Sequence, residues 1–163
     1  MEALNYQFED FLASVDDEYK DFVVTVNELL LQEGCKVKIA PSKTSIFTVK
    51  YTQGKTRRGM LNFTLNKKGL RVSLFAGNFE KYPDVLNNLH ENMASAIAKS
   101  PICKNMMGPK KCSWADCIGY NIYIGKEHYQ KCRYSCFQFY VDVESIPSLL
   151  NMLKSEIEAR RIA

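Results

Sequence analysis

The sequence lacks the long apolar runs that a membrane-spanning helix requires. No stretch approaches the ~20 apolar residues that cross a bilayer. The first residues, MEALNYQFED, are acidic where a secretory signal would be basic. We therefore expect a soluble, cytoplasmic protein without a membrane partner. Thiols stay reduced in that compartment, so the 6 cysteines are expected to be buried residues, metal ligands or a reactive thiol rather than disulfides.

Catalytic motifs are scarce as well. The sequence has no glycine-rich phosphate loop, no H-E-x-x-H motif and no G-x-S-x-G motif. Its only histidines are His90 and His128. A nucleophilic pair of Cys132 with His128 is one option, but a loop histidine beside lysines is usually solvated. The sequence therefore favours a non-enzymatic protein.

Charge is distributed unevenly along the chain. The formal net charge is +4, yet residues 1–33 carry a net charge of −8 and residues 34–163 a net charge of +12. An acidic flank on a basic remainder is typical of a solvated surface, and it also favours an anionic partner for the basic part.

Hydrophobic periodicity predicts three long helices. The first spans residues 15–33, with Ser14 and Asp17 as a capping box and Gly34 as the C-terminal cap, after a short helix around Phe8. The second begins near Pro83 and continues to residue 99, and the last begins near Pro147.

Between the helices the apolar period changes to two, which predicts antiparallel strands joined by hairpins. These are KVKIA, SIFTVKY, RGMLNFTL and LRVSLFA, followed later by a hairpin of IGYNIYIG with SCFQFYVDV. The predicted fold class is α+β, a two-layer sandwich of a mostly antiparallel sheet with helices on one face. We expect a single domain with four parts: an acidic helical segment (1–34), a βββα part (35–99), a Cys-rich loop (100–117) and a ββα part (118–163).

Two strand-to-helix junctions resemble each other. EKYPDVLNNL at Glu80 and ESIPSLLNML at Glu144 share a proline, an asparagine and two leucines at the same positions. A tandem ββα duplication would explain the match. A proline in the first turn followed by a leucine stripe is also common in unrelated helices, so both explanations stay open.

The strand faces indicate where a ligand would bind. Alternation places the apolar side chains against the helices and leaves a polar, partly aromatic face on the other side of the sheet. We expect a small-molecule or peptide site on that face, with the loop from Met106 to Trp114 closing one side and Arg71 anchoring a carboxylate or phosphate. The ligand-binding candidates are Asn62, Arg71, Trp114, Asn121, Tyr123, Gln138 and Tyr140.

The basic turns GKTRRG and NKKGLR suggest an alternative function. They could hold the phosphates of a nucleic acid through Arg57, Arg58, Lys67 and Lys68, with weak, nonspecific affinity because no element resembles a base-reading helix.

The cysteines suggest a second alternative, a zinc-binding or thiol protein. Two cysteine pairs have nearly the sequence spacing of the ligand pairs in structural zinc sites: Cys112 with Cys117, and Cys132 with Cys136. The predicted hairpin, however, separates Cys117 from Cys136 by roughly 16 Å at about 3.3 Å per residue, which is too far for shared zinc ligation. We therefore expect no metal and no cofactor.

Overall fold

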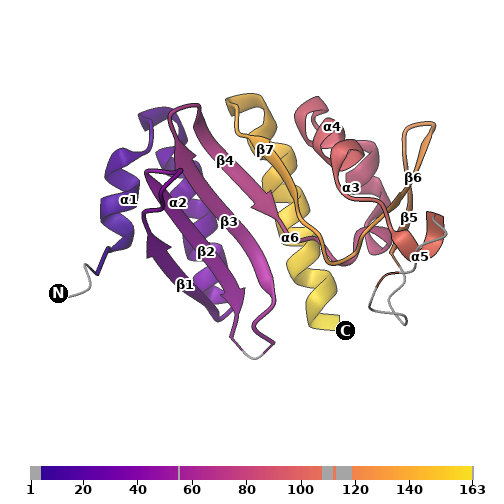
Figure 1. Ribbon diagram of the computed structural model, residues 1–163, viewed down its shortest axis with the longest axis horizontal. Helices are drawn as coiled ribbons and strands as arrows, with labels where there is room; N and C mark the ends of the chain where they lie inside the picture. The colour runs from indigo at the N-terminus through magenta and orange to yellow at the C-terminus, as the bar shows by residue number, and fades with distance from the viewer. Residues whose placement is uncertain (1–4, 55, 108–111, 113–118, 163) are drawn as a thin grey trace. The chain divides into compact units, whose positions relative to one another are not determined.

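The computed structural model describes residues 5–54, 56–107, 112 and 119–162 of the chain, and Figure 1 shows its helices and strands. The fold is α+β, which confirms the predicted class. In chain order the elements are α1 (Phe8–Ser14), α2 (Asp17–Gln32), β1 (Cys35–Ala40), β2 (Phe47–Gln53), β3 (Gly59–Asn66), β4 (Gly69–Leu74), η1 (Phe79–Lys81), α3 (Pro83–Asn87), α4 (Glu91–Lys99), α5 (Lys104–Met107), β5 (Tyr120–Ile124), β6 (Glu127–Lys131), β7 (Phe137–Tyr140), η2 (Val143–Ser145) and α6 (Ile146–Ile162).

Two compact units make up the chain. The first unit comprises Met1–Ser73 and Tyr140–Val143, and the second comprises Leu74–Phe139 and Glu144–Ala163. The hydrogen-bonded strands form a five-stranded sheet in the order β1-β2-β3-β4-β7 and a two-stranded sheet of β5 and β6. Within the described residues, no helix has the length and apolar character needed to cross a membrane.

The first unit is built as the alternation in its strands predicts. β1 pairs antiparallel with β2, and β2 pairs antiparallel with β3. The apolar side chains of these strands face α1 and α2, and Phe63 contacts both helices: its ring centroid lies 5.8 Å from that of Phe11 and 6.0 Å from that of Phe22. All three phenylalanines are buried. The helices therefore cover one face of these strands, and the polar side chains of the strands point to the other.

The N-terminal helices differ from the prediction in their caps. α2 begins at Asp17 with Asp16 as its N-cap, so Ser14 and Asp17 do not form the expected capping box. The capping box lies instead at the start of α1, where the Gln7 amide donates to Asp10 Oδ2 at 2.7 Å. Gly34 ends α2 with φ of 76°, a left-handed conformation that glycine adopts without a Cβ clash.

The predicted long helix after Pro83 is wrong, because the chain forms two helices there. α3 ends at Asn87, and α4 begins at Glu91. His90 caps α4: its Nδ1 accepts a hydrogen bond from the Asn92 amide at 3.2 Å, and its own amide donates to Ser148 Oγ at 3.0 Å. This tertiary contact with α6, inside the second unit, holds the break between the two helices.

The predicted hairpin between IGYNIYIG and SCFQFYVDV is also wrong. β5 pairs with β6, so Ile122 lies opposite Tyr129 rather than near Cys136. Gly125, with φ of 62°, supplies the left-handed residue that a tight turn between these strands requires. β6 has the sequence EHYQK, which lacks the apolar alternation of a strand. The distance derived above for Cys117 and Cys136 therefore loses its basis.

The two similar junctions adopt similar local structures. At each, a short 3-10 helix precedes an α-helix that has a proline in its first turn. The helices differ in length, since α3 has 5 residues and α6 has 17. A duplication is neither required nor contradicted by this local likeness.

Candidate functional site

A basic pocket lies in the first unit, on the polar side of its strands. It has a volume of about 550 Å³. We call this cavity the basic pocket. Its lining residues are Lys43, Thr44, Ser45, Ile46, Thr64, Asn66, Lys67, Lys68, Arg71 and Tyr140. Among these described residues there is no carboxylate, imidazole or thiol, whereas four side chains are cationic. The pocket is therefore suited to an anion.

The loop before β2 forms one wall of the basic pocket, and hydroxyl groups fix its shape. Ser42 Oγ accepts hydrogen bonds from the amides of Thr44 at 3.3 Å and Ser45 at 3.1 Å, as serine commonly does in turns. The Ile46 amide then donates to the Leu65 carbonyl at 2.8 Å. This bond ties the loop to the end of β3 and so places Lys43 beside the β3–β4 hairpin.

The β3–β4 hairpin forms a second wall of the basic pocket. Asn66 Oδ1 accepts a hydrogen bond from the Lys68 amide at 2.8 Å, which closes the turn that carries Lys67 and Lys68. Gly69 follows with φ of 130°. Asn66 Nδ2 also donates to the Tyr140 hydroxyl oxygen at 3.0 Å. One asparagine therefore orders both the lysine-bearing turn and the tyrosine.

Arg71 is the most unusual residue of the basic pocket. It extends from β4 and is half-buried, and its Nε is buried without a hydrogen-bond acceptor among the described residues. A buried donor that lacks an acceptor costs about 1–3 kcal/mol. Within the described part of the chain, no carboxylate forms an ion pair with Arg71 or with the pocket lysines. An anionic ligand would supply the acceptor that the described residues do not.

The structure brings only some of the predicted site residues together. Arg71 and Tyr140 line the basic pocket, while Asn62 points from the same face of β3 without lining it. Asn121 and Tyr123 lie on β5, in the separate two-stranded sheet with β6. Both side chains contact His128. Asn121 forms a hydrogen bond with it, and the Tyr123 ring stacks on the imidazole with the ring centroids 4.7 Å apart. Trp114 lies outside the described residues.

Gln138 lines a second pocket, which lies in the second unit. Its volume is about 530 Å³. The lining residues are Phe75, Ala96, Lys99, Ser100, Pro101, Tyr134, Ser135, Cys136, Phe137 and Gln138. Its described lining residues include one cation and are mostly apolar or hydroxyl-bearing, so among them charge is not concentrated as it is in the basic pocket.

The described cysteines do not form a metal site. No group of three or more His, Cys, Asp or Glu side chains comes together among the described residues, and Cys117 lies outside them. Cys132 is distinctive for another reason. Burial raises the pKa of its thiol, but hydrogen bonds from the Ser135 hydroxyl and from the Tyr134 and Ser135 amides outweigh burial and lower the pKa below its ordinary value.

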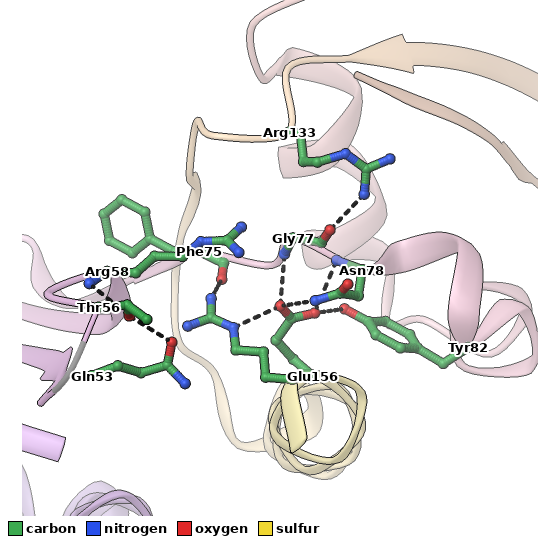
Figure 2. Close-up of polar contacts among 10 residues, drawn as sticks. Gln53, Thr56, Arg58, Phe75, Gly77, Asn78, Tyr82, Arg133 and Glu156 are labelled. Carbon is green, nitrogen blue, oxygen red and sulfur yellow. Dashed lines mark hydrogen bonds and ion pairs between the residues drawn. The ribbon is translucent and has the colours of Figure 1, made fainter. Parts of the chain in front are cut away.

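A buried carboxylate organises the second unit, as Figure 2 shows. Glu156 has no exposed surface. Its Oε1 accepts a hydrogen bond from the Gly77 amide at 2.7 Å and pairs with Arg160 Nε at 2.9 Å, and its Oε2 accepts one from the Tyr82 hydroxyl at 2.6 Å. Burial and the neighbouring Glu156 raise the pKa of Tyr82. Because the carboxylate is sealed from solvent, we interpret this network as structural.

A second arginine holds the same loop. Arg133 Nη1 donates to the Gly77 carbonyl at 2.6 Å, as Figure 2 shows, and pairs with Glu80 Oε1 at 2.6 Å. Its guanidinium also stacks 4.6 Å from the centre of the Tyr120 ring. The segment after β4 is therefore fixed from α6 by Glu156 and from the turn after β6 by Arg133.

The residues proposed for nucleic-acid contact lie at opposite ends of β3. Arg57 and Arg58 precede the strand, and Lys67 and Lys68 follow it. The 8 residues of β3 span roughly 25 Å at about 3.3 Å per residue. The two basic turns therefore do not form one cluster, and only the second contributes to the basic pocket.

Two features of the structure were not predicted from the sequence: the loop wall with Lys43, Thr44 and Ser45, and the buried Glu156. The loop gave a local signal, since PSKTS combines a lysine with hydroxyl residues that favour turns. Glu156 also gave a sequence signal, because it lies at helical spacing from Leu149, Met152 and Leu153, which marks a carboxylate on the buried side of α6.

Comparison with protein-family models, curated proteins and solved structures finds no significant match to this chain.

Proposed function

We propose that this chain is a non-enzymatic binding module that takes an anionic small molecule in the basic pocket. The observation that carries the proposal is the buried Arg71 Nε, which has no acceptor among the described residues although it lies in a pocket lined by three further cations. A guanidinium binds carboxylate or phosphate oxygens through two parallel N–H groups. The lysines add attraction for the same charge.

Size and ordering also support the proposal. A volume of about 550 Å³ falls within the range of roughly 300–1,000 Å³ that is typical of small-molecule pockets. The Ser42 turn and the Asn66 contacts fix both walls before any ligand binds. A pre-ordered site loses less entropy on binding, so it gains affinity from the same contacts.

The proposal is tested by thermal unfolding and heteronuclear NMR with benzoate, inorganic phosphate and phenyl phosphate, and with benzylamine as the oppositely charged control. A ligand at about 100 times its Kd should stabilise the chain by about 2.7 kcal/mol. We expect at least one anion to raise the melting temperature and to shift the amides of residues 43–46 and 66–68, while benzylamine does neither.

Arg71→Ala should abolish this stabilisation. The matched control is Lys50→Ala, which removes the same charge from an exposed position on β2 outside the pocket lining. If Arg71→Ala and Lys50→Ala weaken anion binding equally, general charge attraction explains the binding and the proposed site is wrong. If no anion binds at millimolar concentration, the proposed function is wrong.

A further inference from the structure

We propose that the anion held in the basic pocket is a phosphomonoester whose organic part carries a flat ring. This inference rests on the proposed function, because it names the class of molecule that the same pocket would take. Four features of the pocket support it: its charge, its hydrogen-bond donors, the position of Tyr140 and its size.

The charge of the basic pocket favours a dianion over a single carboxylate. Lys43, Lys67, Lys68 and Arg71 all contribute to the lining, and none of these four pairs with a carboxylate in the described part of the chain. A phosphomonoester carries a charge of about −1.5 to −2 near neutral pH, whereas a carboxylate carries a single charge. The dianion therefore compensates more of the charge that the pocket concentrates.

The hydrogen-bond donors also fit a phosphate group. A phosphate presents three acceptor oxygens, so it can use the Arg71 guanidinium, the lysine ammonium groups and a hydroxyl at the same time. The hydroxyl of Thr64 lies on the same strand face as Asn66, two residues from it, and lines the pocket. A carboxylate has only two acceptor oxygens, and a bidentate contact with one guanidinium engages both, so it leaves fewer acceptor sites than a phosphate for the lysines and the hydroxyl.

Tyr140 provides a flat surface at the edge of the pocket. Its side chain is 37% exposed, and its hydroxyl is fixed by Asn66 at 3.0 Å. An added Cβ at Gly69 would lie 3.9 Å from Tyr140 Cδ1, so the ring rests beside the glycine of the neighbouring strand. With its hydroxyl and one edge held in this way, the ring has a defined orientation in which it can stack on a ligand ring.

The size of the pocket leaves room for this organic part. A volume of about 550 Å³ suits a ligand larger than an inorganic anion. Ile46, which is 51% exposed, adds an apolar surface to the lining. The pocket therefore combines charged donors with an apolar and aromatic edge, which matches a phosphate joined to a ring.

The test is calorimetric titration of the full chain with phenyl phosphate, benzoate and inorganic phosphate at about pH 7.5, where the phosphate group is mostly a dianion. We expect phenyl phosphate to bind about tenfold more tightly than either of the other two anions, because only it offers both the dianion and the ring. Its affinity should fall at about pH 5, where the phosphate becomes a monoanion. The described residues that line the pocket include no histidine, carboxylate or thiol, so this fall would follow from the ligand.

Each contrary outcome has a distinct meaning. Benzoate binding as tightly as phenyl phosphate would overturn the phosphate assignment and leave the proposed function intact. Inorganic phosphate binding as tightly as phenyl phosphate would overturn the role of the ring. Binding of a single-stranded oligonucleotide that is much tighter than that of phenyl phosphate would replace the small molecule with a nucleic acid. Failure of all the anions would overturn the proposed function itself.

A pair of variants tests the ring contact without disturbing the core. Tyr140→Leu should bring the affinities for phenyl phosphate and inorganic phosphate together, because it removes the stacking surface. Tyr123→Leu removes another exposed tyrosine, which lies on β5 outside the basic pocket, and should keep the tenfold preference. Equal preferences in the two variants would show that Tyr140 does not contact the ring.

Discussion

Asn66 donates a hydrogen bond from Nδ2 to the Tyr140 hydroxyl oxygen at 3.0 Å, although 74 residues separate them in the sequence. The same side chain accepts the Lys68 amide at 2.8 Å. Asn66 thus joins the aromatic edge of the basic pocket to its lysine-bearing turn. The ligand site that we propose depends on this connection within the first unit.

Replacing Asn66 should weaken ligand binding although the residue need not touch the ligand. Asn66→Ala removes the hydrogen bond that orients Tyr140 and the one that closes the turn, so we expect about a fivefold to tenfold loss of affinity for phenyl phosphate, in line with about 1–1.5 kcal/mol for a hydrogen bond. Asn62→Ala, on the same strand face but outside the lining, is the control. Calorimetry with both variants checks this, and an unchanged affinity in Asn66→Ala would contradict it.

Glu156 should be the most sensitive polar residue of the second unit. Glu156→Gln removes the negative charge that faces Arg160 and presents an amide donor to groups that also donate, namely the Gly77 amide and the Tyr82 hydroxyl. Breaking a buried pair in this way costs about 3–5 kcal/mol. Urea unfolding should therefore show a large loss of stability for Glu156→Gln and almost none for Glu158→Gln, which is exposed on the same helix. Similar losses in both variants would argue against the network.

Stability should decline at alkaline pH. Burial, followed by the neighbouring Glu156, raises the pKa of Tyr82 above its ordinary value of 10.0. Above about pH 10 the unfolded chain releases this proton while the folded chain retains it, so the unfolding free energy falls by about 1.4 kcal/mol per pH unit for this group. The stabilisation is fully present below pH 10.

Denaturant unfolding of wild type and Tyr82→Phe at increasing pH measures this contribution. Because Tyr82→Phe cannot release the proton, the stability difference between the two proteins should shrink as the pH rises above 10. Tyr123→Phe, which changes an exposed tyrosine, should follow the wild type. A difference between wild type and Tyr82→Phe that stays constant with pH would show that Tyr82 ionises alike in both states.

Cys132 should be the fastest of the described cysteines to alkylate near neutral pH. The hydrogen bonds that outweigh burial lower the pKa of its thiol, and the thiolate is the reactive form. Cys35 and Cys103 are buried and should react slowly. Ser135→Ala should slow the alkylation of Cys132 several-fold, whereas Ser95→Ala, exposed on α4, should not. Mass spectrometry of partly alkylated protein checks this, and equal rates in both variants would contradict it.

The sequence was informative where local pattern and tertiary structure agree. The strands of the first unit alternate clearly because helices cover only one of their faces, so β1 to β4 could be predicted. The break between α3 and α4 could not be predicted, since it depends on the contact of the His90 amide with Ser148, 58 residues away. β6 could not be predicted either, because its polar sequence pairs through a turn at Gly125 and not through an apolar face.

The candidate site divides in the same way. Arg71 and Tyr140 could be assigned to the polar face from alternation alone. Lys43 could not, because its loop reaches the pocket through the long-range bond between the Ile46 amide and the Leu65 carbonyl. Asn121 and Tyr123 were wrongly assigned to the same sheet as Arg71. Alternation correctly places both side chains on the exposed face of β5, but β5 belongs to the two-stranded sheet. Local periodicity identifies a face and cannot identify the sheet that carries it.

The most direct test of the account is an NMR titration of the labelled full chain with phenyl phosphate that follows the Nε–H resonance of Arg71 together with the backbone amides. We predict that this resonance shifts along with the amides of residues 43–46 and 66–68, and that all of them saturate with a single Kd. Shifts confined to the β5–β6 hairpin or to the residues around Cys136, with the Arg71 resonance unmoved, would contradict the claim that the basic pocket is the binding site.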